Sequence, residues 1–276
     1  MANEKKNGGL QLFNRTITDP STQKYLQDVL GERKGSFVNN LTALVANNAS
    51  LQECQPLTVM FAALKATALN LPLENSLGFA YCIPYKDNKS GTTVAQFQLG
   101  YKGLTQLALR SGLFAIIPNA TDVKEGELKS RNRLTGECKF EFIENDEERA
   151  KAKTIGFASY FRLMNGAEST FYMSVEEMEK HALRYSQTYR SKNEYVKKSS
   201  KWTTDFVDMA KKTVIKLNLS RNAPLSVEMQ DAIRADQSVM HEANKYEYVD
   251  NQPIADVQKA QEIAAKFADF EVVDEK

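Results

Sequence analysis

The sequence is poor in the residues that build most metal centres and many catalytic sites. Its 276 residues include only three cysteines, Cys54, Cys82 and Cys138, and two histidines, His181 and His241. The cysteines are widely spaced and form no CxxC pair, so the sequence supports neither a zinc site nor a disulfide framework. We therefore expect reduced thiols in a protein of the cytoplasm.

Nucleotide-binding motifs and membrane signals are also missing. Neither GxxxxGK[ST] nor GxGxxG occurs, and GERKGS at residues 31–36 has the wrong spacing to cradle a phosphate. The N-terminal residues lack an apolar run after their charges, and the chain contains no stretch of eighteen apolar residues. These absences predict a soluble intracellular protein that works without ATP, without another cofactor and away from membranes. A divalent cation could assist, but the sequence contains no recognisable site for one.

Charge is balanced over the whole chain but unevenly distributed along it. There are 36 Lys plus Arg and 35 Asp plus Glu, for a formal net charge of +1. Residues 180–221 hold eleven basic and three acidic residues, whereas residues 222–276 hold five basic and twelve acidic ones. A basic stripe attracts polyanions, and an acidic tail is usually solvated or docks elsewhere. The pattern predicts a polyanionic partner for the basic segment.

The chain is 42% hydrophobic, which is ample for one main domain with appendages. We expect a flexible N-terminal arm over residues 1–35 that orders only against another surface, a core over residues 36–243, and a separate acidic helical segment over residues 244–276.

Two hairpins and several helices are predicted within the core. Strands over 79–85 and 94–99 flank a polar loop, residues 116–148 resemble irregular strands, and Asn165-Gly166 predicts a type I′ turn between two extended segments. Ser174 and Glu177 form a capping box that begins a helix, and Ser186 to Ser200 has no periodicity and predicts a mobile loop. The other predicted helices span 35–48, 57–70, 100–111, 200–220, 225–243 and 255–270.

One constellation resembles the active site of a metal-dependent nuclease. Asp122, followed by Glu137 and Lys139, has the order acid, acid-x-Lys, in which carboxylates hold a hard cation and lysine stabilises charge near a scissile phosphate. The pattern is short and lies among other acidic residues. A solvated strand edge is the alternative interpretation.

The basic residues form two candidate surfaces for phosphate. Lys102, Gln106 and Arg110 are spaced four apart and line one helix face, which could equally be an ordinary exposed face. Further along, basic residues alternate with aromatic ones whose faces could stack on unpaired bases. This second set comprises Arg190, Lys192, Lys197, Lys198 and Lys201, interleaved with Tyr185, Tyr189, Tyr195 and Trp202. The helix after it adds Lys211, Lys212 and Lys216, and Trp202 and Phe206 could instead belong to the core.

The stretch QFQLGYKGLTQLALRSG at residues 96–112 resembles a signature of the RecT family of phage single-strand DNA annealing proteins. Other blocks agree in order. They are Leu77-Gly78 with Tyr81 and Pro84 upstream, and Trp202, Met209 to Thr213 and Pro224 downstream. The similarity spans roughly residues 37–230.

This resemblance implies an α+β fold, a small antiparallel β-sheet with hairpins backed by helices in a Rad52-like annealing core. It implies a DNA-binding protein, not an enzyme, that anneals single-stranded DNA to a complementary strand without ATP along a basic groove of a ring or helical filament. It also implies that a partner 5′ to 3′ exonuclease and the host single-strand binding protein dock on the C-terminal segment, in the cytoplasm of a bacterial host of a phage or prophage. The acidic tail could instead be an autoinhibitor that mimics DNA phosphates.

By position, the resemblance assigns candidate DNA contacts and candidate groove-lining or stacking groups. The former are Lys102, Arg110, Arg184, Lys211, Lys212 and Lys216, and the latter are Tyr81, Tyr101, Trp202 and Phe206. Two alternatives to annealing remain open at this point. One is the nuclease that uses Asp122, Glu137 and Lys139, and the other is a non-annealing protector of single strands.

Overall fold

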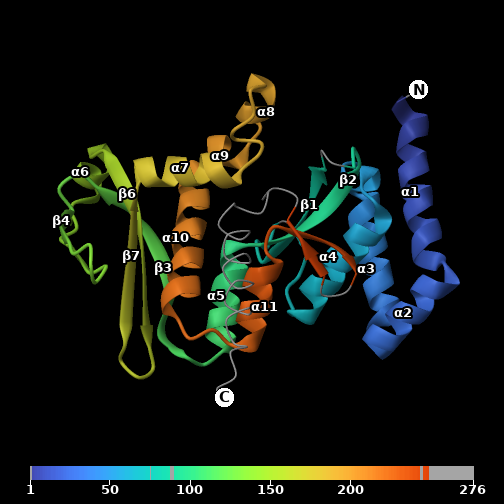
Figure 1. Cartoon of the computed structure of the whole chain (residues 1–276), viewed down its shortest axis with the longest axis horizontal. Helices are drawn as coiled ribbons and strands as arrows, with labels where there is room; N and C mark the ends of the chain where they lie inside the picture. The colour runs from blue at the N-terminus through green and yellow to red at the C-terminus, as the bar shows by residue number, and fades with distance from the viewer. Residues whose placement is uncertain (1, 75, 88–89, 243–244, 249–276) are drawn as a thin grey trace, which may run out of the picture.

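The computed structural model describes residues 2–74, 76–87, 90–242 and 245–248. It is an elongated α+β structure in which helices cover antiparallel sheets, as predicted (Figure 1). The larger sheet has the strand order β1-β2-β8-β9 and the second has the order β3-β6-β7. The first sheet consists of Ala80–Lys86, Thr93–Leu99, Ser238–Glu242 and Lys245–Glu247; the second of Phe114–Lys124, Thr154–Leu163 and Glu168–Ser174. A small hairpin of β4 (Leu128–Arg131) and β5 (Cys138–Phe140) lies at one end.

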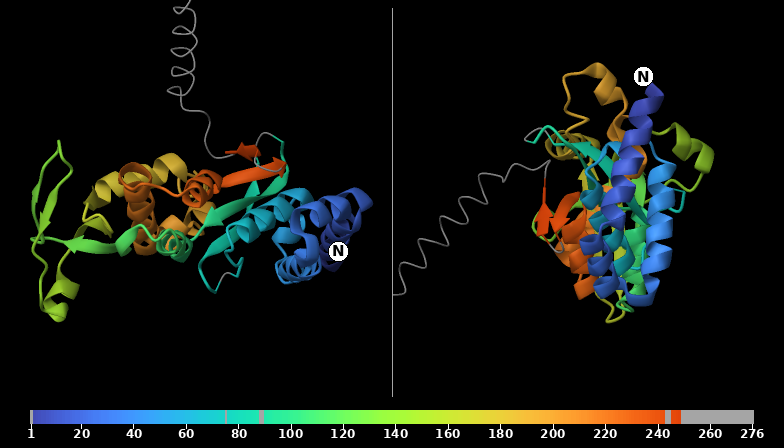
Figure 2. Two further views of the ribbon diagram at one scale, coloured as in Figure 1. Left: turned by 90° about the horizontal axis from the view of Figure 1, so that it is seen from below. Right: turned by 90° about the vertical axis from the view of Figure 1, so that its right-hand side faces the viewer.

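Helices gather at the N-terminal end of the molecule (Figure 2). They are α1 (Ala2–Thr18), α2 (Pro20–Leu30), α3 (Lys34–Ala46) and α4 (Pro56–Ala68), with 3₁₀ turns at Gly31–Arg33 and Leu51–Glu53. The predicted flexible arm over residues 1–35 is instead helical and packed, because Phe13, Ile17 and Leu26 are buried in the main core. Leu10, Phe13 and Ile17 have the spacing of a helical stripe that packs on one side. Asp19 caps α2, and Pro20 occupies its first turn.

The β1–β2 hairpin is confirmed, with Ala80 opposite Leu99 and Lys86 opposite Thr93. Side chains alternate between its faces. Ala95, Phe97 and Leu99 are buried on the side of α4, and the other face carries Gln96 and Gln98. Polar residues on that second face indicate that it meets something other than the hydrophobic core.

The second predicted hairpin is confirmed, but its turn type is not. β6 and β7 pair from Gly156 opposite Ser174 to Arg162 opposite Glu168. Only Gly166 has a positive φ, +85°, whereas a type I′ turn needs it at Asn165 as well. The Asn165 side chain instead accepts a hydrogen bond from the Ala167 N–H at 3.0 Å. This longer loop places Met164 within hydrogen-bonding reach of Leu113.

The basic segment, residues 180–221, differs from the prediction in its loop and in its long helix. The capping box at Ser174 and Glu177 is confirmed and begins α7 (Val175–Tyr185). The predicted loop 186–200 contains a short helix, α8 (Glu194–Lys198), which is capped by Asn193. The predicted helix 200–220 is divided at Asp205, whose φ is −134° and ψ is 47°, into α9 (Lys201–Thr204) and α10 (Phe206–Asn222).

Only the first half of the predicted helix 225–243 is helical. α11 (Val227–Ala235) ends at Asp236, and Gln237 adopts a φ of +66° before β8 begins. β8 pairs with β2 through Gln96 opposite Val239 and Phe97 opposite Ser238. The buried run of β8 fits a sheet that is covered by α4, so tertiary packing outweighs helical propensity here. The predicted helix 255–270 lies outside the described residues.

Two hydrophobic cores result, together with a third, minor cluster of Val123, Ala158 and Tyr172. The larger one joins α1 to α4, the β1-β2-β8 sheet and α5 (Tyr101–Arg110), and the smaller one packs Phe157, Met178, Trp202 and Val214 between β6, α7 and α10. A further short helix, α6 (Asp146–Lys151), precedes β6. Within the described residues, no helix is both long and apolar enough to cross a membrane.

Candidate nucleic-acid interface

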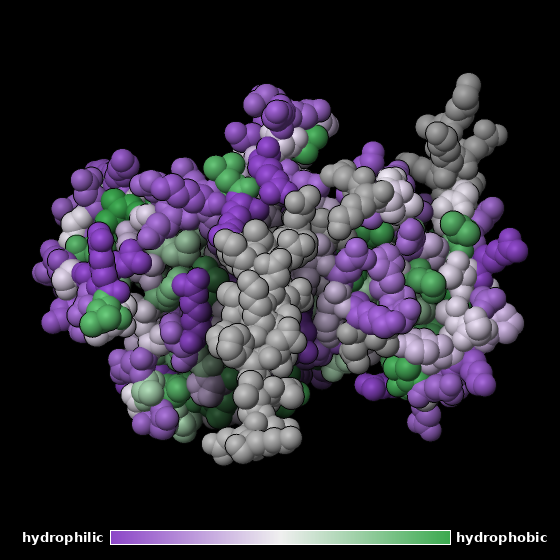
Figure 3. Space-filling view, in the orientation of Figure 1, coloured by the Kyte–Doolittle hydropathy of each residue, from purple (hydrophilic) through white to green (hydrophobic). Residues whose placement is uncertain are grey.

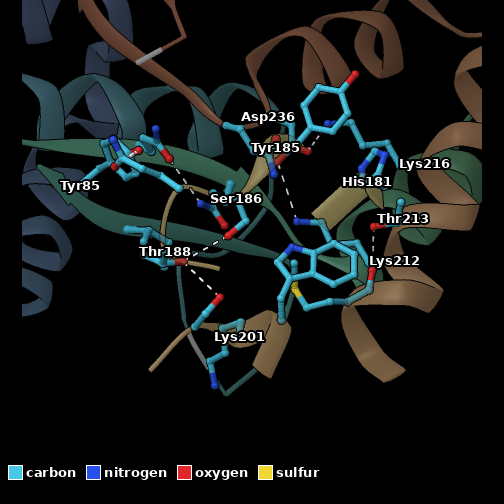
Figure 4. Close-up of a pocket in the computed structure, with 18 of the residues that line it drawn as sticks. Tyr85, His181, Tyr185, Ser186, Thr188, Lys201, Lys212, Thr213, Lys216 and Asp236 are labelled. Carbon is cyan, nitrogen blue, oxygen red and sulfur yellow. Dashed lines mark hydrogen bonds and ion pairs between the residues drawn. The ribbon is translucent and has the colours of Figure 1, made fainter. Parts of the chain in front are cut away.

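A cavity of about 490 Å³ lies between the open face of the β1–β2 hairpin and the α7 to α10 region (Figure 4). One wall consists of strand residues, and the opposite wall comes from the end of α7, the following loop and α10. α11 and the chain after it close one side through Asp236 and Tyr248. The segment with the highest density of basic residues therefore faces a polar strand surface.

The strand wall presents amide and hydroxyl groups. Gln96 and Gln98 lie two residues apart on β2, and the Gln98 side-chain N–H donates to Gln96 Oε1 at 3.4 Å. The Tyr85 hydroxyl donates to the Gln187 side chain, which links β1 to the loop after α7. Such groups both donate and accept hydrogen bonds, so they suit a ligand with mixed polar edges.

Two lysines of α10 share one buried carboxylate in the opposite wall. The Asp236 side chain is 1% exposed. Its Oδ1 accepts from the Leu99 N–H at 2.8 Å and lies 3.9 Å from Lys212 Nζ, and its Oδ2 accepts from Lys216 Nζ. Burial would raise the pKa of Asp236, but the charges of Lys212 and Lys216 and the hydrogen bonds outweigh it, and the pKa is lowered. The group of three retains one net positive charge, held in a fixed position.

The two α10 lysines of the cavity differ in how far their side chains are exposed. The Lys212 side chain is 13% exposed, and that of Lys216 is 26% exposed. Desolvation lowers the pKa of Lys212, the charge of Lys216 lowers it further, and the charge of Asp236 opposes both without reversing them. Lys216 pairs more closely with Asp236 but is the more exposed of the two, so an external anion can reach it more readily than Lys212.

Aromatic groups surround the lysines. Trp202 is 7% exposed and packs in the smaller core, with only part of its surface toward the cavity. Tyr185 lies beside His181, with 4.5 Å between ring centroids. Burial, followed by the charges of Lys216, Arg221 and Arg184, lowers the pKa of His181 to about 4. His181 is therefore neutral at pH 7 and adds no charge to the cavity.

The loop between α7 and α9 forms the rim of the cavity and carries α8 on a projection above it (Figures 1 and 3). The loop is anchored by a 3.1 Å hydrogen bond between the Thr188 and Ser200 hydroxyls. Lys201 lines the cavity, and its side chain is 76% exposed with Asp205 as its ion-pair partner. Lys197 lies over the Tyr189 ring. The exposed ion pair between Lys201 and Asp205 contributes little to stability, so Lys201 is available to another anion.

The other predicted contacts do not line this cavity. Lys197 and Lys198 lie on the rim in α8, Arg184 lies over the Tyr185 ring, and Phe206 packs edge-on against Trp202 and Phe157. Among the described residues, Lys211 makes no ion pair. Tyr81 is half-buried opposite Gln98, and Tyr101 is exposed with its hydroxyl 3.3 Å from Asn119 Oδ1.

The predicted basic face on α5 is separate from the cavity. Lys102 is exposed and Gln106 half-buried, and neither lines the cavity. The Arg110 guanidinium donates to the backbone carbonyls of Leu69 and Asn70, both at 2.8 Å, just after the end of α4. Helix ends leave carbonyls unsatisfied, and a cation there also complements the helix dipole. Arg110 therefore holds α5 against α4.

Replacing Arg110 with alanine is expected to lower the free energy of unfolding by about 1–2 kcal/mol, because two carbonyls lose a charged donor. DNA affinity should change less than twofold if this residue has a structural role only. Urea unfolding followed by Trp202 fluorescence, together with oligonucleotide binding by anisotropy, measures both. A large loss of affinity without a loss of stability would restore Arg110 as a DNA contact.

The nuclease constellation is occupied by cations of the chain itself. The Asp122 carboxylate lies 3.0 Å from Lys124 Nζ and 3.6 Å from the Arg149 guanidinium. Burial would raise the pKa of Asp122, but the hydrogen bond from Lys124 and the charge of Arg149 lower it. Glu137 and Lys139 lie in the separate β4–β5 hairpin region. Within the residues that the structure describes, no group of three or more His, Cys, Asp and Glu could hold a metal ion.

Sequence reasoning missed Asp236 and the strand wall. Asp236 was hidden inside an assumed helix, although an acid between Ala235 and Gln237 marks a break in the apolar pattern. Gln96 and Gln98 belong to the signature stretch, and their alternation with Ala95, Phe97 and Leu99 could have placed them on one strand face. Tyr85 had no distinguishing signal.

Two glycines of the signature have a structural explanation. A Cβ on Gly100 would lie 2.0 Å from the Gly78 carbonyl oxygen, and one on Gly103 would lie 2.1 Å from the Phe79 carbonyl oxygen. Only glycine permits this approach of α5 to the chain that enters β1. The signature therefore fixes how α5 joins the hairpin that supplies the strand wall.

The fold and the cavity together place lysines of the basic segment opposite a polar face of an antiparallel sheet. The sequence profile described as the RecT family matches residues 35–250. The uncharacterized protein YqaK of Bacillus subtilis (strain 168) is 37% identical over 243 residues, covering 86% of this chain and 78% of that protein. Protein RecT of Escherichia coli (strain K12) is 28% identical over 231 residues, covering 80% and 78%.

The chain belongs to the RecT family, which confirms the resemblance carried by residues 96–112. Membership associates it with DNA binding, DNA annealing and DNA recombination, and with annealing proteins rather than catalysts.

Proposed function

We propose that this chain binds single-stranded DNA along the cavity and anneals it to a complementary strand without ATP or another cofactor. The observation that carries the proposal is the convergence of Lys201, Lys212 and Lys216 with a polar strand wall at one cavity. Lysines can grip phosphates without reading sequence, which leaves base edges available to a second strand. Duplex formation then supplies the driving free energy.

The arrangement suits a backbone grip more than base stacking. Trp202 is buried in the smaller core, so little of its face is available to a base. Tyr185 and Tyr85 are better placed to contact sugars or bases, because both line the cavity. The rim lysines Lys197 and Lys198 would meet the strand where it leaves the cavity, along with Arg184 and Lys211.

Self-assembly would multiply these modest contacts. One subunit offers few net positive charges, but linked subunits along one strand bind with an avidity far above that of a single site. We therefore propose a ring or filament in which the cavities form a continuous groove. We further propose that a partner 5′ to 3′ exonuclease and the host single-strand binding protein dock on residues 244–276.

Site-specific photo-crosslinking tests where DNA lies. A benzophenone amino acid at Gln98 should crosslink to a single-stranded oligonucleotide, while the same group at Lys139, in the β4–β5 hairpin, should not. Both positions leave the cavity lysines intact. Equal crosslinking at the two positions, or crosslinking at Lys139 alone, would contradict binding in the cavity.

A further inference from the structure

The last residue that the structure describes lies at the proposed DNA site. This residue, Tyr248, lines the cavity, and the Tyr248 hydroxyl donates to the Arg234 carbonyl. The charges of Lys216 and Asp236 both influence the pKa of Tyr248, which burial raises. The remaining 28 residues, 249–276, therefore start within reach of the cavity lysines.

Those residues have the opposite charge to the cavity rim. Residues 249–276 contain seven acidic and three basic residues, a net charge of −4. Residues 180–221, which supply the cavity lysines and its rim, carry a net charge of +8. In the stretch FADFE, Phe267 and Phe270 alternate with Asp269 and Glu271. Anionic and flat apolar groups thus follow each other, as phosphates and bases do in a single strand.

We infer that residues 249–276 bind the cavity of their own chain and compete with single-stranded DNA for it. This inference rests on the proposed function of the cavity as the DNA site. Carboxylates of the segment would meet Lys201 and Lys216, and its apolar groups would meet the Trp202 and Leu217 side of the wall. A partner protein that captures the segment would free the cavity, so partner docking and DNA loading would be coupled.

Because residues 249–276 are tethered to the cavity, even weak binding of this segment would compete with DNA. A segment joined by a short flexible link has an effective concentration of about 1 mM at its site. If the free segment binds with a Kd of about 0.1 mM, the tethered one weakens DNA binding by about tenfold, because it occupies most cavities. Salt screens these contacts, so the effect should shrink as salt increases.

The test uses the full chain with four tail charges removed, Asp269→Asn, Glu271→Gln, Asp274→Asn and Glu275→Gln. A matched control removes four exposed acids far from the cavity, Glu137→Gln, Glu144→Gln, Glu147→Gln and Glu148→Gln. Anisotropy of a labelled oligonucleotide gives the Kd at low and at high salt. We expect about tenfold tighter binding for the tail variant alone at low salt, and convergence of all three chains at high salt. Equal tightening in the control would reduce the effect to net charge and overturn the inference.

A second readout needs no DNA. Trp202 is the single tryptophan of the chain, and residues 249–276 contain neither tryptophan nor tyrosine. Adding a peptide of residues 249–276 to the tail variant should therefore change Trp202 emission, and the wild-type chain should need about tenfold more peptide. An unchanged emission together with equal DNA affinities overturns the inference while the cavity remains the DNA site. A changed emission in a chain that binds no DNA supports the contact and contradicts the proposed function.

Discussion

Replacing Lys201 and Lys216 by alanine is expected to weaken single-stranded DNA binding by about 10- to 100-fold near 0.1 M salt. Each lysine that contacts a phosphate of single-stranded DNA contributes about 0.7 to the slope of log affinity against log salt, so the slope should fall by about 1.4. Lys201 is 76% exposed, and Lys212 remains to pair with Asp236 when Lys216 is removed. The loss of affinity should be similar for unrelated oligonucleotide sequences.

The control for this pair removes two lysines elsewhere, Lys129→Ala and Lys151→Ala. Both are exposed, on β4 and α6, and neither lines the cavity. The control changes the net charge equally, so it should lower affinity only slightly and leave the salt slope unchanged. A double cavity variant with the wild-type slope would contradict the assignment of Lys201 and Lys216 as phosphate contacts.

Replacing Asp236 by asparagine is expected to lower the free energy of unfolding at pH 7 by about 3 kcal/mol. Breaking a buried ion pair from one side leaves uncompensated charge, here on Lys212 and Lys216. Asparagine has nearly the same shape and can still accept from the Leu99 N–H, so the loss reports the charge. Asp236 joins β2, α10 and the α11–β8 junction, so its effect on stability should exceed that of Arg110.

The pH dependence of this effect has a definite sign. Because the pKa of Asp236 is lowered in the folded chain, its contribution is present above the ordinary aspartate pKa of about 4 and is lost as pH falls through the lowered value. Urea unfolding at several pH values should show a constant difference between the two chains down to about pH 4 and a shrinking difference below it. Equal stability at pH 7 would show that the carboxylate charge is unimportant.

Local signals in the sequence were sufficient for elements whose packing is simple. The capping box at Ser174 and the two hairpins, predicted from extended runs on either side of short polar loops, each depend on neighbours in the chain. Local signals failed where packing against distant segments determines the secondary structure. Phe13 and Ile17 are helical because α1 packs on the main core, and β8 is a strand because β2 offers an edge. Neither partner can be read from the segment itself.

The candidate site was predictable in charge but not in geometry. The excess of lysines over residues 180–221 identified the basic wall, whereas helix-face spacing gave Arg110 equal weight with Lys216. Their environments differ: Arg110 donates to carbonyls after α4, and Lys216 reaches a carboxylate 20 residues along the chain. Spacing along a helix defines a face, but only the neighbouring elements determine what that face meets.

Lys212, Lys216 and Asp236 concentrate positive charge at the cavity of a chain that is nearly neutral overall. Asp236 neutralises one charge in the free protein and holds both ammonium groups in place, so little ordering is required when phosphate arrives. Under the proposed function, the affinity of a single cavity for DNA is modest. Affinity for long strands would then come from assembly, and a competing acidic segment could regulate it within one chain.

An annealing assay without ATP tests the proposed function directly. Two complementary labelled oligonucleotides are mixed in sequence with the full chain, without ATP, and pairing is followed by fluorescence while a denaturing gel reports strand length. We predict pairing faster than the spontaneous rate, with both strands intact. Binding that slows pairing would identify a protector of single strands, and shortened strands would identify a nuclease; either result would contradict the annealing function.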